Sequence, residues 1–174
     1  LEAQNKFAEA SGEYKVIAGK AARFPAVQSQ AKLGTGRCLV GNKQYSEAEG
    51  FFNDLAEKAE DGTVLAGAYN GLGDCFKDKF EKDATNIDNL RKALFAYLRG
   101  VVLYTPGKGD DTGEHARALV NAGWCFEKLK DTMPTPEAKE KYKANARNLY
   151  RECLGTYRGT KSAEEAESRL KRLE

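Results

Sequence analysis

The sequence lacks a long apolar run. No stretch approaches the roughly 18 residues that a helix needs to cross a bilayer, so we expect no membrane insertion of this segment. It also lacks an excess of either charge, because 28 basic and 26 acidic residues leave a net charge of +2. A surplus this small does not make nucleic acid the expected partner. Hydrophobic residues fill 41% of the 174 positions, which is enough to bury a core.

Histidine is nearly absent, which argues against most metal and catalytic sites. His115 is the single histidine, and without a second imidazole or a paired thiol it makes a poor metal site. No serine or cysteine stands at helical spacing from it to act as a nucleophile. Gly34-x-Gly36 lacks the spacing of a dinucleotide-binding loop. We therefore expect no catalytic residue, no metal and no cofactor, and we expect His115 to be exposed in the first turn of a helix.

Cysteine pairs with metal-binding spacing are lacking too. The four cysteines include no Cys-x-x-Cys, and Cys38, Cys75 and Cys125 each lie two residues after a glycine. We expect these three and Cys153 to be buried, free thiols. Such thiols fit a reducing compartment but also survive in an oxidising one, so localisation in the cytoplasm or in a bacterial cell envelope stays open. Because the chain begins at Leu1 rather than methionine, we expect upstream sequence such as a signal or anchor.

The sequence does contain a short pattern, Gly-x-Cys followed by a large apolar residue, that occurs three times. The copies are Gly36–Leu39, Gly73–Phe76 and Gly123–Phe126. Each stands in a stretch with helical periodicity, where a glycine costs roughly 1 kcal/mol relative to alanine. Three glycines at equivalent places indicate that a second helix approaches the backbone closely at each of them.

A second helix with matching spacing follows each copy. It carries a small residue at one position and an aromatic residue four positions later, on the same helical face. The pairs are Ala48 with Phe52, Ala93 with Tyr97, and Ala146 with Tyr150. Additional residues separate the two helices of the second and third units, and we expect both additions to project from one edge of a stack. The pattern predicts three helix-turn-helix units.

With this repeat the chain resembles the tetratricopeptide repeat family, whose units of about 34 residues stack into a superhelix. The resemblance includes the Leu72-Gly73 pair and Pro106 near the end of a second helix, and the segment from Tyr157 to Ala166 is similar to bacterial cell-envelope members. It implies an all-α, right-handed α-α superhelix, for which we expect seven helices. The expected parts are a half repeat at 1–25, repeats at 26–62, 63–107 and 111–158, and a C-terminal capping helix at 160–174.

Two segments leave alternatives open. The apolar stripe of residues 1–25 repeats the spacing of the second helices, so either the chain begins in mid-repeat or this helix caps the stack. The basic stretch from Lys139 to Arg151 is either a solvated helix face or a strip that binds phosphate groups.

The resemblance also implies where a partner protein or peptide binds. In the family the residue after the repeat glycine faces the concave side, and residues one helical turn away extend the same face. The implied groove residues are Leu33, Arg37, Asn70, Asp74, Lys77, Val120, Trp124 and Lys128. Trp124 would serve as an aromatic anchor, or alternatively would pack under the long addition of its own unit. A structural spacer or assembly piece is the alternative function, and the oligomeric state stays open.

Overall fold

A computed structural model describes residues 1–4, 6–107 and 112–173, and within these ranges the chain is helical with no strand. The predicted start of the third repeat at 111 and the predicted end of the cap at 174 lie outside the described residues. The elements are η1 (Glu2–Gln4), α1 (Phe7–Lys20), α2 (Pro25–Gly41), α3 (Tyr45–Glu57), α4 (Gly62–Lys82), α5 (Ile87–Val102), α6 (Gly113–Lys130), α7 (Pro136–Thr156) and α8 (Lys161–Leu173).

The all-α class is confirmed, but the expected helix number is wrong. The described residues form eight α-helices rather than seven, because a half repeat, three two-helix units and a cap require one more helix than we counted. None of the described helices is both long and apolar enough to cross a membrane.

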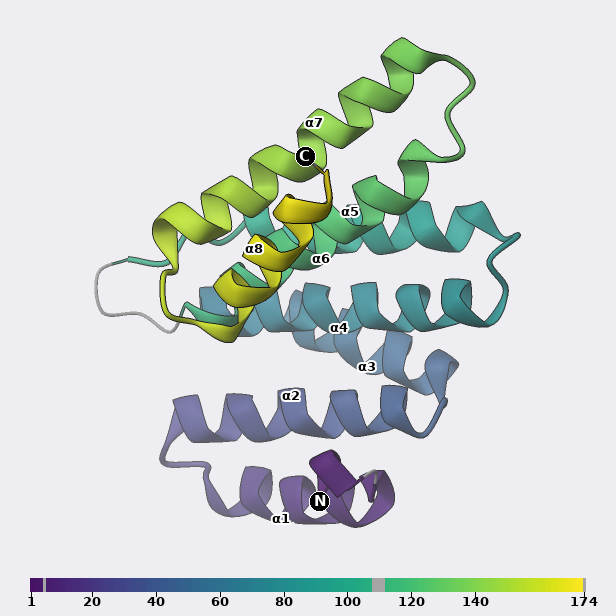
Figure 1. Ribbon diagram of the computed structural model, residues 1–174. Helices are drawn as coiled ribbons and strands as arrows, with labels where there is room; N and C mark the ends of the chain where they lie inside the picture. The colour runs from purple at the N-terminus through teal and green to yellow at the C-terminus, as the bar shows by residue number, and fades with distance from the viewer. Residues whose placement is uncertain (5, 108–111, 174) are drawn as a thin grey trace.

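Each helix packs against the next along the chain, so α1 and α7 lie at opposite ends of the stack, and α8 folds back onto α6 (Figure 1). The even-numbered helices make a second set of contacts, α2 with α4, α4 with α6, and α6 with α8. The odd-numbered helices make no comparable contacts with one another in the described ranges. We call α2, α4, α6 and α8 the even layer, and this layer brings together residues far apart in the sequence.

Aromatic side chains explain the repeat glycines. A Cβ atom added to any of the three would meet the ring of the aromatic residue in the following helix. The pairs are Gly36 with Phe52, Gly73 with Tyr97, and Gly123 with Tyr150. All three rings are fully buried. The predicted close approach of a second helix at each glycine is therefore confirmed.

The additions in the second and third units mostly lengthen helices. Residues 83–86 connect α4 to α5, and residues 131–135 connect α6 to α7. The Thr135 hydroxyl accepts a hydrogen bond from the Ala138 amide at 3.2 Å, and Pro136 is the first residue of α7. Both features favour a helix start here, so the chain re-enters a helix after a short loop.

The cysteines lie as expected, whereas the histidine does not. All four cysteines are buried and free. His115 is only 4% exposed, so the expectation of an exposed side chain is wrong. Its Nε2 lies 3.1 Å from the Val101 carbonyl oxygen and its Nδ1 lies 2.6 Å from the Tyr157 hydroxyl. The ends of α5 and α7 close over the first turn of α6, which the spacing along α6 alone does not reveal.

Candidate functional site

The eight residues implied as a groove do not form one open surface. Leu33 and Asn70 are fully buried, and Val120 and Trp124 are 2% and 7% exposed. Leu33 fills the space above Gly67 of α4. The even layer buries Leu33 and Asn70 because both α2 and α6 contact α4.

Trp124 lies in an apolar cluster between units. Its ring packs edge-on against Phe80 of α4, with 6.2 Å between ring centroids. The same cluster contains Leu90 and Leu94 of α5. The Nζ atoms of Lys77 and Lys128 lie 4.7 and 6.0 Å from the ring centroid. The indole therefore belongs to the interior, with two ammonium groups close to its ring.

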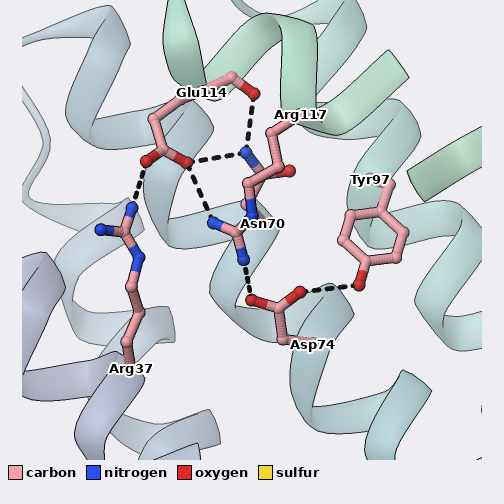
Figure 2. Close-up of polar contacts among 6 residues, drawn as sticks. All are labelled: Arg37, Asn70, Asp74, Tyr97, Glu114 and Arg117. Atoms are coloured by element: carbon pink, nitrogen blue, oxygen red, sulfur yellow. Dashed lines mark hydrogen bonds and ion pairs between the residues drawn. The ribbon is translucent and has the colours of Figure 1, made fainter. Parts of the chain in front are cut away.

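A network of polar side chains connects α2, α4, α5 and α6 (Figure 2). The Arg37 guanidinium pairs with the Glu114 carboxylate, linking α2 to α6. The Asn70 amide donates to the Glu114 carbonyl oxygen at 2.7 Å and to its carboxylate at 2.8 Å. Arg117 pairs with Glu114 and Asp74, and Asp74 also accepts from the Tyr97 hydroxyl at 2.8 Å. Six side chains from four helices thus form one continuous network.

The network is balanced in charge. Desolvation disfavours the charged form of Arg117, but the carboxylates of Asp74 and Glu114 outweigh it and raise the pKa of the guanidinium. Burial and then the Asp74 charge raise the pKa of Tyr97, so its hydroxyl keeps the proton that it donates. Two cations face two carboxylates, and each carboxylate has partners within the protein. The network therefore holds helices together and leaves no spare charge for a ligand.

A hollow of about 340 Å³ lies beside this network, between α4, α6 and α8. It is lined by Asp74, Lys77, Arg117, Val120, Asn121, Lys161, Ser162 and Glu165. Of the eight expected groove residues, the structure brings Asp74, Lys77 and Val120 together here, and Lys77 links the hollow to Trp124. Arg37, Leu33 and Asn70 do not line it. We call it the α4–α6–α8 hollow.

Sequence reasoning missed five lining residues. Arg117 and Asn121 stand seven and three positions before Trp124, so helical spacing places them on one face of α6 with it. That signal was present in the sequence. Lys161, Ser162 and Glu165 were assigned to a capping helix, and nothing in their own spacing indicates that the first turns of α8 border a cavity.

Lys77 and Lys161 line the hollow without an oppositely charged partner among the described residues. Asp74 is paired with Arg117, and Glu165 is paired with Arg169 at 2.9 Å. Lys77 and Lys161 form no ion pair with any residue in the described ranges. Lys161 also begins α8, where the helix dipole adds partial positive charge. The surplus in the hollow is therefore positive.

A hollow of about 490 Å³ combines Arg151 and Arg158 with Glu164 and Glu167. Two other hollows, also larger than the α4–α6–α8 hollow, lack such a surplus. One of about 420 Å³ between α2 and α3 mixes Lys32 and Lys58 with Asp54, Glu60 and other residues. One of about 550 Å³ is formed by the first turns of α2 and α4 and by Tyr104, and its lining is mostly small and neutral. Neither offers a concentration of one charge that would select a ligand class.

Among the described residues, no group of three or more His, Cys, Asp or Glu side chains is placed to hold a metal ion. No known family, no curated protein and no solved structure matches the chain.

Proposed function

We propose that the chain is a tetratricopeptide-type scaffold, a right-handed superhelix without enzymatic activity, that binds a segment of a partner protein on its even layer. Three features support this proposal: the glycine–aromatic pairs recur in each unit, the units stack in chain order, and the even-numbered helices contact one another. In such a stack the helices that pack on one another in this way form the surface available to an extended or helical peptide.

The single observation that carries the proposal is the α4–α6–α8 hollow with its unpaired lysines. A carboxylate-bearing segment would find the ammonium groups of Lys77 and Lys161 without an ion pair, whereas a basic segment would find Asp74 and Glu165 already paired. Complementary charge of this kind favours the correct partner and disfavours the wrong one. The expected ligand is accordingly an acidic peptide segment.

A specific observation also supports the alternative function of an assembly piece. Val16, Ile17 and Phe24 are 50%, 40% and 65% exposed, although each is a large apolar side chain. Exposed apolar patches mark interaction surfaces more often than isolated apolar residues do. Binding of a peptide and assembly through a different face are compatible with one another.

Fluorescence anisotropy tests the peptide proposal. The probe is a short fluorescein-labelled peptide of glutamate interspersed with leucine and glycine, and the matched peptide has glutamine in place of glutamate. We expect the acidic probe to bind and the matched peptide to bind more weakly. Replacing Lys77 and Lys161 together by glutamine should lower the affinity for the acidic probe about fivefold, since each exposed charge pair contributes modestly to binding.

Lys141→Gln is the matched control because Lys141 is exposed on α7 and does not line the hollow. It removes a positive charge while leaving the hollow unchanged, so affinity should stay near that of the wild type. Equal binding of both peptides, or an equal loss in the control, would refute the acidic-peptide site.

A further inference from the structure

The exposed face of α1 carries two large apolar side chains, Val16 and Ile17, that take no part in the proposed peptide site. α1 packs on α2 through the face that carries Phe7 and Tyr14, where the Tyr14 ring covers Gly34 and the Phe7 ring covers Gly41. Val16 lies on the side of α1 turned away from Tyr14, and Ile17 lies at the edge of that exposed side. Leu1 and Glu2 border a hollow beside Ile17, but Val16 and Ile17 are still 50% and 40% exposed.

Charged residues flank these two apolar side chains symmetrically. Glu13 stands three positions before Val16, and Lys20 stands three positions after Ile17. Residues three and four apart share a helical face, so all four side chains lie along one stripe of α1. Within the described ranges neither Glu13 nor Lys20 takes part in an ion pair.

Two copies of this stripe are complementary to each other when they lie antiparallel. If two α1 helices lie antiparallel about a two-fold axis between positions 16 and 17, Val16 of each copy meets Ile17 of the other. Glu13 of each copy then meets Lys20 of the other, which makes two apolar contacts and two ion pairs from one patch. Closed dimers of soluble proteins use this kind of interface, in which the same patch of both subunits takes part.

The backbone of α1 also allows a second helix to come close. Gly12 and Gly19 lie in exposed positions beside Val16, and a Cβ added to either would meet no atom within 4 Å. They are therefore not explained by packing inside the chain, unlike Gly34, Gly36 and Gly73, each of which faces a ring. Small residues along a helix let a neighbouring backbone approach.

From this arrangement of residues we propose that the chain forms a two-fold symmetric homodimer through antiparallel packing of α1 on α1. The other end of the chain does not suit head-to-tail association, because Glu164, Glu167 and Lys171 give α8 a charged exposed surface. A single helix pair buries less than the roughly 1,200 Å² of a standard interface, so the dimer is weak and depends on concentration. The dimer is independent of the peptide site, which lies on α4, α6 and α8.

Sedimentation velocity over a wide concentration range tests the proposal. The wild type should shift from monomer towards dimer as concentration rises. Glu13→Lys alone, or Lys20→Glu alone, replaces two attractive pairs by two repulsive ones and should raise the dimer dissociation constant about tenfold. The double variant Glu13→Lys/Lys20→Glu exchanges the charges within each pair and should restore the wild-type value.

Mixing the two single variants gives a stricter result. The Glu13→Lys chain presents two lysines and the Lys20→Glu chain presents two glutamates, so the mixture should form a heterodimer more readily than either variant alone self-associates. Circular dichroism checks that each variant keeps its helix content, as expected for changes at exposed positions. A wild type that stays monomeric at every concentration, or a dimer that no single reversal weakens, would overturn the proposal.

Discussion

Trp124 is held in the interior by contacts from more than one helix. Its ring packs on Phe80, and only 7% of the residue is exposed. Removing a buried aromatic side chain leaves a cavity and typically costs about 3 kcal/mol or more. Trp124→Ala should therefore lower the free energy of unfolding by about 3 kcal/mol, as measured by urea denaturation followed by circular dichroism.

Val102→Ala provides the comparison, since Val102 is 74% exposed. Its effect should stay within about 0.5 kcal/mol. A Trp124→Ala variant as stable as this control would place the indole outside the core.

A buried thiol predicts a dependence of stability on alkaline pH. Burial raises the pKa of Cys75 from 9.0 to about 12. Between these values the unfolded thiol loses its proton while the folded thiol keeps it, so the free energy of unfolding falls as pH rises. Below about pH 9 both states are protonated and Cys75 contributes no slope. We expect Cys75→Ala to flatten the decline between pH 9 and 11 in denaturation curves, and an unchanged slope would contradict this.

Single glycines decide how closely neighbouring helices pack. An added Cβ at Gly73 would overlap the Tyr97 ring, whereas one at Gly50 in α3 would meet nothing within 4 Å. Overpacking typically costs about 1 to 3 kcal/mol, and alanine is preferred over glycine in a helix by up to about 1 kcal/mol. Gly73→Ala should therefore destabilise the protein, and Gly50→Ala should stabilise it by about 0.5 kcal/mol.

Thermal unfolding of the two variants checks the prediction. The melting temperature should fall for Gly73→Ala and rise slightly for Gly50→Ala. If both substitutions shift it in the same direction, the close helix approach at Gly73 is not what determines packing.

The sequence predicted the helices and their closest contacts because both depend on short-range spacing. Gly73 and Tyr97 could be paired in advance, since each belongs to a repeated pattern. The surroundings of Asn70 and His115 could not, because they are set by which neighbouring helix lies above each residue. Spacing along one helix shows which residues share a face. Only the packing of the helices in the even layer shows that a neighbouring helix covers this face.

The candidate site was predicted only in part for the same reason. Asp74 and Lys77 lie on one face of α4, which their spacing indicates. Lys161 joins them across the molecule because α8 packs on α6. A contact between elements so distant in the chain leaves no trace in local periodicity.

Glu114 of α6 connects this helix to α2 and α4. It pairs with Arg37 and Arg117 and accepts from Asn70, and its side chain is 10% exposed. Glu114→Gln keeps the shape of the side chain but leaves two guanidinium groups with one carboxylate between them. Breaking a buried pair costs several kcal/mol, and partial exposure of both arginines reduces this to about 2 kcal/mol.

Urea denaturation should show that loss as a lower midpoint for the whole molecule. Glu140→Gln is the control, because the Glu140 side chain is 64% exposed in its pair with Arg147. Its effect should stay within about 0.5 kcal/mol. Equal stability of both variants would mean that the network does not hold α2, α4 and α6 together.

A titration followed by amide NMR tests whether an acidic segment binds in the α4–α6–α8 hollow. The acidic peptide probe is added to isotope-labelled protein, and the indole of the single tryptophan serves as an internal reporter. We expect the shifts to concentrate at Lys77, Asn121 and Ser162, with a smaller change at the Trp124 indole next to Lys77. Shifts confined to the hollow between α2 and α3, or no saturable shifts at all, would contradict binding in the α4–α6–α8 hollow.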